Sequence, residues 1–405
     1  QTKKMRGDAE LNLPDYAAAE HTLTSILPSA RRVYGRAHPE LADILGRLGT
    51  VFTQQGRLGE AEPVLREAVA MRIETLGADH PDVQLARVEL GRQLQNRGQF
   101  ASAESLFVAA YEARRRALGE MSPATASSLG DLGALAFARG DWAGADSMLR
   151  ASVRVWRAAE IEDQALYYES IIGAVLVQRD RFLDADSLLR RVTDARIAMY
   201  GPQHWSVGDA QEKRAAARLR LGDVRTADSL VTNGLAIRRV VYGPRSSAVA
   251  NQLPALATVR EVQGDTLAAI TALRESIELY VALRRSPDEP SLIDTRRALA
   301  LGLCSTGQTS EGSALADTLV QRLTANVLPL RQHRVRATAG YCRFRAGRPA
   351  EAEALLLEAA RGFDSIAPVT SGVRPSDVAR WLEEVYSALG RANDAATWRA
   401  RRGGL

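Results

Sequence analysis

A short phrase that recurs about every 42 residues constrains this chain more than any other feature. It occupies residues 55–62 and returns at 97–104 and 139–146. Its turn position falls at Pro14, Gly56, Gly98, Gly140, Asp180, Gly222, Gly264, Gly307, Gly347 and Gly390, with spacings of 40 to 43 residues. A fixed period in this range is typical of a repeat array. Because each repeat buries its apolar stripe on its neighbours, one array can extend through 405 residues.

Small residues recur at two fixed places around the turn. Seven residues before it stand Gly49, Gly91, Gly133, Gly173, Ala215, Ala257, Ala300 and Gly340. Five residues after it stand Ala19, Ala61, Ala103, Ala145, Ala185, Ala227, Ala269, Gly312, Ala352 and Ala395. Glycine inside a helix costs about 1 kcal/mol relative to alanine. The pattern therefore predicts paired helices in close contact at these columns, and glycines of positive φ at the turns.

The order of these features resembles the tetratricopeptide repeat: a small residue, the turn, an alanine and then a large apolar residue. The 42-residue period and the link Leu-Gly-Ala-Asp-His-Pro-Asp-Val at residues 76–83 are similar to the kinesin-light-chain subtype. The resemblance implies an all-α, right-handed superhelical solenoid of antiparallel helix pairs, forming a single array over residues 1–405. Its expected repeats are about 1–35 (partial), 36–77, 78–119, 120–161, 162–201, 202–243, 244–286, 287–326, 327–368 and 369–405 (a C-terminal cap).

Catalytic patterns are missing from the sequence: it has no Walker loop, no dinucleotide-binding glycine fingerprint and no kinase catalytic loop. We therefore expect neither an enzyme nor a cofactor. The tripeptide His80-Pro81-Asp82 matches a co-chaperone motif, but its place in a repeat link favours a structural role. The five histidines lack ligand spacing, so no metal site is expected. Cys304 and Cys342 are interpreted as two small buried hydrophobes rather than as a disulfide.

The charge pattern bears on possible partners. The net charge is +5, and the arginines at Arg72, Arg114 and Arg196 follow each turn by 16 to 18 residues. That spacing places them near the end of a second helix, where cations offset the helix dipole. A continuous basic stripe is lacking, so nucleic acid is not an expected partner. No apolar run approaches a membrane span.

The first 13 residues read as the tail of a helix, which suggests a piece of a longer protein. The chain could thus lie in the cytoplasm or beyond a membrane span of its parent. Residues 381–399 are similar to the ends of bacterial serine/threonine kinases that carry such repeats. Any kinase activity would reside outside these 405 residues.

The resemblance also implies a ligand groove lined by the first helix of each repeat. The candidate groove residues are Thr50, Gln54, Arg92, Gln95, Asn96, Ser127, Ser170, Gln178, Asn251, Arg297 and Tyr341. The preferred cluster is Gln54, Arg92, Gln95 and Asn96, which combines a cation with amides able to bond a peptide backbone. Where kinesin light chains carry paired asparagines, this chain has Gly130-Asp131, so their peptide specificity does not transfer.

The sequence thus predicts a non-catalytic scaffold that binds a peptide or protein segment, as the docking or sensing region of a bacterial signalling protein. The alternative is a structural module that self-associates through its exposed faces or ends.

Overall fold

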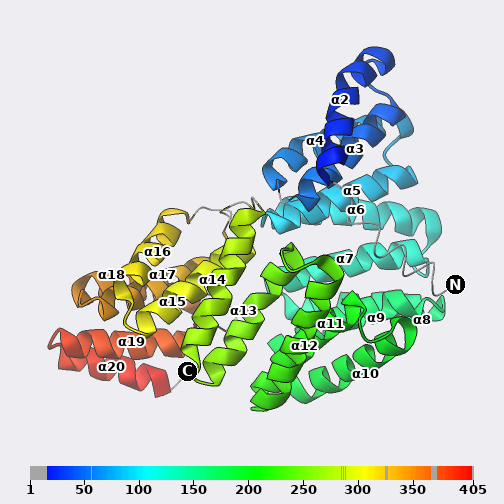
Figure 1. Cartoon of the computed structure of the whole chain (residues 1–405). Coiled ribbons are helices and arrows are strands. Elements are labelled where there is room, and N and C mark those ends of the chain that lie inside the picture. Colours follow the sequence, from blue (N-terminus) through cyan, green and yellow to red (C-terminus); the bar gives the residue numbers. More distant parts are fainter. Residues whose placement is uncertain are drawn as a thin grey trace. The chain divides into compact units, whose positions relative to one another are not determined.

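The computed structural model describes residues 16–55, 57–283, 285, 287, 289–323, 327–365 and 372–403. Over those ranges every regular element is a helix (Figure 1). In chain order they are α2 (Tyr16–Tyr34), α3 (Pro39–Gln54), α4 (Leu58–Leu76), α5 (Pro81–Asn96), α6 (Phe100–Leu118), α7 (Pro123–Arg139), α8 (Trp142–Ala158), α9 (Glu162–Gln178), α10 (Phe182–Tyr200), α11 (Trp205–Arg220), α12 (Val224–Tyr242), α13 (Ser247–Val262), α14 (Thr266–Ala282), α15 (Pro290–Ser305), α16 (Thr309–Gln321), α17 (Pro329–Arg345), α18 (Pro349–Asp364), α19 (Pro375–Ala388) and α20 (Ala392–Gly403).

The chain divides into two compact units. The first contains residues 1–221, 232–249 and 280–286, and the second contains 222–231, 250–279 and 287–405. Within each unit, short links make successive helices antiparallel. The first helices of successive repeats also touch: α5 with α7, α7 with α9 and α9 with α11, and in the second unit α15 with α17 and α17 with α19. The all-α architecture of antiparallel pairs is confirmed, while the single array and its repeat boundaries stay predictions.

The glycine column packs directly against the large apolar residues of the paired helix. A Cβ atom added to Gly49 would lie 2.5 Å from Leu65, and one added to Gly91 would lie 2.5 Å from Phe107. At Gly133 the distance to Leu149 would be 2.8 Å. Such separations are far shorter than a carbon–carbon contact, so only glycine allows the two helices to approach this closely. The alanine column is buried as well, as at Ala61, Ala103 and Ala145.

The turn position requires a left-handed backbone. Gly98 has φ 76° and Gly140 has φ 85°, as the sequence predicts. Gly56 lies outside the described residues. Asp180, the one non-glycine turn residue between Gly56 and Gly390, adopts φ 56° all the same. The repeat geometry therefore imposes this conformation even where the residue disfavours it.

Histidines begin three of the first helices. The Asp82 amide donates a hydrogen bond to His80 Nδ1 at 3.2 Å, and Pro81 follows at the first helical position. His38 receives the Glu40 amide at 3.2 Å in the same way. Each histidine thus satisfies an amide that lacks a partner at a helix start. The structural role predicted for His80-Pro81-Asp82 is confirmed.

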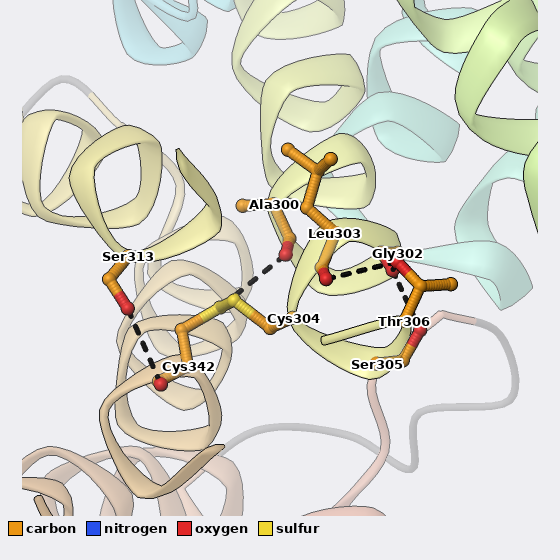
Figure 2. Close-up of a disulfide and its surroundings, with 8 residues drawn as sticks. All are labelled: Ala300, Gly302, Leu303, Cys304, Ser305, Thr306, Ser313 and Cys342. Atoms are coloured by element: carbon orange, nitrogen blue, oxygen red, sulfur yellow. Dashed lines mark hydrogen bonds between the residues drawn. A yellow bond between two sulfur atoms is a disulfide. The ribbon is translucent and has the colours of Figure 1, made fainter. Parts of the chain in front are cut away.

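The prediction that the two cysteines stay unpaired is wrong. Cys304 on α15 and Cys342 on α17 form a disulfide, with their Cα atoms 5.3 Å apart (Figure 2). Both are buried, as expected. Their separation of 38 residues is close to one repeat, and stacked first helices bring residues one repeat apart side by side. The spacing of the two cysteines along the chain does not by itself show that α15 and α17 stack.

The disulfide also explains the one glycine in the alanine column. A Cβ atom on Gly312 would clash with Cys304 Sγ and would lie 3.0 Å from the Ala300 carbonyl oxygen. The sulfur therefore occupies the space that an alanine methyl fills in the other repeats.

Ion pairs join successive repeats wherever an acidic residue directly follows the column alanine. The acidic residue directly after the column alanine accepts an arginine from the following repeat, as in Glu20–Arg57, Glu62–Arg97, Glu104–Arg139, Asp146–Arg179, Asp186–Arg218, Asp228–Arg260 and Glu353–Arg391. Arg196 departs from the expected helix-end role. Its Nη1 donates to the Ser206 carbonyl oxygen at 2.7 Å and its Nη2 to that of Leu166 at 3.2 Å, so it bonds neighbouring helices.

Candidate functional site

Two cavities lie along the first helices of the first unit. The first has a volume of about 510 Å³ and opens over α3, α5 and α7. Its lining is Thr50, Thr53, Leu85, Val88, Glu89, Arg92, Gln93, Asn96, Arg114 and Ser127. The structure therefore brings together four of the predicted groove residues, Thr50, Arg92, Asn96 and Ser127. The Thr50 hydroxyl donates to Glu89, which fixes that carboxylate at the wall.

Arg92 is held in place by a buried carboxylate. Its Nη2 and Nε donate to Asp131 Oδ1 at 2.8 and 3.2 Å. Burial raises the pKa of Asp131 although the neighbouring Arg92 opposes that shift. Arg92 remains largely exposed, and its Nη1 makes no hydrogen bond with the described part of the chain. The guanidinium is thus oriented by Asp131 and still has donors for a ligand oxygen.

The second cavity, of about 540 Å³, shares Arg92 and Ser127 with the first and extends over α9, α10 and α11. Its other lining residues are Asp163, Gln164, Tyr167, Tyr168, Arg196, Tyr200, His204, Trp205 and Ser206. Burial and a hydrogen bond to Asp163 both raise the pKa of Tyr200, so its hydroxyl keeps its proton and donates. Burial lowers the pKa of His204, whose Nδ1 caps α11. Five of its eleven lining residues carry an aromatic ring, and the rest are polar or charged.

The other predicted groove residues lie elsewhere. Gln95 is half-buried on α5 outside both linings, and the side chain of Gln54 lies outside the described residues. Ser170 is buried and donates to Asp209 at 3.0 Å, and Gln178 lies at the end of α9 away from both linings. Asn251, Arg297 and Tyr341 belong to the second unit. Tyr341 packs there against Trp381, with ring centres 4.6 Å apart.

Several lining residues escaped the sequence analysis. The sequence pattern did not predict Glu89, Asp163, Gln164, Tyr200, His204 or Trp205 as site residues. The link between α10 and α11 does carry a sequence signal for an aromatic site. Tyr200, His204 and Trp205 place three rings within six residues just before and at the start of a first helix.

No group of three or more histidine, cysteine, aspartate or glutamate side chains in the described ranges is placed to hold a metal ion. Among the helices that the structure describes, none combines the length and apolar character needed to cross a bilayer.

Two models of one family match residues 41–158 of the chain. Residues 41–82 match one model of the tetratricopeptide repeat, and residues 82–158 match another. No curated protein matches the sequence.

Solved structures extend the likeness in fold. A Rap protein complexed with Competence and Sporulation Factor aligns with 90% of this chain and 97% of its own, at a TM-score of 0.57 and 11% identity. The apo form of RapI covers 89% and 97%, at a TM-score of 0.52 and 11% identity. A kinesin light chain-like repeat protein of Podosopora anserina covers 51% and 98%, at a TM-score of 0.43 and 22% identity. Residues 41–158 therefore match the tetratricopeptide repeat, within a chain whose all-helical fold is similar to that of Rap proteins.

Proposed function

We propose that the chain is a non-catalytic scaffold that binds an extended peptide or protein segment along α3, α5, α7, α9 and α11. The observation that carries the proposal is the pair of adjacent cavities that share Arg92 and Ser127. Together they line a continuous path over the first helices of successive repeats. Tetratricopeptide repeats are generally scaffolds of this kind, and a protein of similar fold was solved in complex with a factor.

The chemistry of the path suits a peptide backbone. Asn96 is exposed at the first cavity, and Gln164 lines the second. Amide side chains both donate and accept, as a peptide group does, and Arg92 adds a charged donor between them. Leu85, largely exposed at the first cavity, offers an apolar contact for a side chain. A segment lying across both cavities would thus find partners for its main chain and its side chains.

The test uses a displayed library of random dodecapeptides and a variant that fills the path. Ser127 borders both cavities, so Ser127→Trp should abolish the enrichment of peptides that the wild type shows. The matched control is Ser147→Trp on α8, an exposed position on a second helix, which should enrich peptides as the wild type does. Failure of the wild type to enrich any peptide, or equal enrichment by Ser127→Trp, would overturn the proposal.

We further infer from the sequence of residues 381–399 that this scaffold is the docking region of a bacterial signalling protein such as a serine/threonine kinase. The coding sequence upstream of residue 1 tests this link, because it should then encode the kinase catalytic loop and its metal-binding aspartate. Self-association stays the alternative, and sedimentation velocity across a concentration series distinguishes it from a monomeric scaffold.

A further inference from the structure

The second cavity gathers an unusual number of partly exposed rings. Tyr167 is 45% exposed, Trp205 41% and Tyr200 38%. Tyr200 stacks on His204 with ring centres 4.4 Å apart, and His204 lies 5.6 Å from Trp205. Large aromatic side chains normally bury most of their surface. Here α9, α10 and the start of α11 instead hold their rings around one hollow of about 540 Å³.

The charged side chains at this cavity differ in whether they have a partner. Arg92 is paired with Asp131 at 2.8 Å. Arg196 is buried and donates to the carbonyl oxygens of Ser206 and Leu166, with Asp209 at 3.5 Å. Asp163 forms no ion pair within the described part of the chain, and its carboxylate lies beside the Tyr200 hydroxyl, whose pKa it helps to raise. A single carboxylate therefore remains for a ligand cation.

We propose that this cavity is the specificity pocket for a cationic side chain, arginine or lysine, of the segment bound along the first helices. The inference rests on the function proposed above. The faces of Tyr167, Tyr200 and Trp205 attract a cation through their negative π surfaces. Asp163 completes the site with a charge-assisted hydrogen bond. Arg92 is paired with Asp131 and Arg196 donates to two carbonyl oxygens, so Asp163 is the carboxylate left unpaired among the described residues of this wall, and it repels an acidic side chain.

The experiment measures which residue the pocket selects. The probes are immobilised pools of random octapeptides that share one fixed central residue: arginine, lysine, citrulline, norleucine, glutamate or tryptophan. Citrulline keeps the shape of arginine and removes its charge. The wild type should retain the arginine and lysine pools about tenfold better than the citrulline and norleucine pools, the range of one desolvated cation–aromatic contact combined with a carboxylate.

Three variants test whether the preference for cationic peptides arises in this pocket. Asp163→Asn preserves the acceptor for Tyr200 and should reduce the arginine-to-citrulline ratio to about twofold while the citrulline pool binds as before. Tyr167→Ala, which removes a partly exposed ring, should reduce the arginine-to-citrulline ratio as well. The matched control is Glu162→Gln, which removes an adjacent charge that pairs with Arg157 at 3.7 Å outside the cavity, and it should keep the tenfold ratio.

The outcomes separate the two proposals. Retention of peptides without a preference for the cationic pools, or a preference for glutamate or tryptophan, overturns the pocket and leaves the scaffold function standing. A cationic preference that Asp163→Asn leaves unchanged also overturns the pocket. Retention of no pool by the folded wild type, checked by circular dichroism, overturns both.

Discussion

Asp180 shows most clearly how the repeat dictates backbone conformation to a residue that disfavours it. Its φ of 56° lies in the same left-handed region as the φ of 76° at Gly98 and of 85° at Gly140, which occupy the equivalent turns. A left-handed backbone costs an L-residue roughly 1–2 kcal/mol. The neighbouring turns avoid that cost by using glycine, so Asp180 retains a local strain that a single substitution relieves.

We expect Asp180→Gly to unfold at a higher urea concentration than Asp180→Ala, with a difference of about 1 kcal/mol in the free energy of unfolding. Both variants lose the exposed contact between Asp180 and Arg220 at 3.4 Å, so their comparison isolates the backbone. Relative to the wild type, Asp180→Gly should be as stable or more stable. A glycine variant that unfolds before the alanine variant would show that the turn is not left-handed.

At the scale of elements, the contact between α10 and α11 depends on a carboxylate shared by two arginines. Asp186 Oδ1 accepts from Arg214 Nε at 2.8 Å and from Arg218 Nε at 2.7 Å, and Oδ2 accepts Arg218 Nη2 at 2.6 Å. Burial pushes the pKa of Asp186 upward, but the hydrogen bonds from Arg218 and Arg214 outweigh burial and the pKa is lowered. Arg214 on α11 thus has a definite partner on α10.

The lowered pKa gives a pH signature. A carboxyl whose pKa is lower in the folded than in the unfolded state contributes stability above its unfolded pKa of about 3.9 and loses it as the pH falls further. Asp186→Asn should cost about 3 kcal/mol at pH 7, because it leaves two arginines without their counter-charge. Urea unfolding from pH 7 to pH 3 should show this difference constant down to about pH 5 and shrinking below pH 4. A difference independent of pH would contradict it.

The sequence predicted the helices wherever the small residues and the turn that define a helix pair lie within one repeat. The glycine and alanine columns located the helix pairs, because a small residue at a fixed distance from each turn has a packing cause, as Gly91 against Phe107 shows. The site was predictable only in part. Thr50, Arg92, Asn96 and Ser127 follow the first-helix pattern, whereas Tyr200 comes from a second helix and His204 from a link. A pattern counted along first helices cannot place side chains that reach the cavity from other elements.

At the scale of the whole molecule, the stacking of repeats determines which residues of different repeats are in contact, and spacing along the sequence does not show this directly. Cys304 and Cys342 look unrelated along the chain, but α15 and α17 are neighbours in the second unit. The same principle makes stability nearly additive along an array, since each repeat contacts only its neighbours. A cross-link between two repeats should therefore stabilise those repeats and leave distant ones unchanged.

Removing the disulfide tests that locality. Closing a loop of 38 residues by a disulfide stabilises a protein by about 2–4 kcal/mol. In the double variant Cys304→Ala/Cys342→Ala, amide hydrogen exchange should accelerate in α15, α16 and α17, while α3 to α11 exchange as in the wild type. Gly312→Ala should destabilise this background less than the wild type, because the sulfur is gone while the Ala300 carbonyl oxygen, 3.0 Å from an added Cβ atom, remains. Alkylation of both cysteines in the folded, unreduced wild type would contradict the cross-link, and accelerated exchange in α3 to α11 would contradict its local effect.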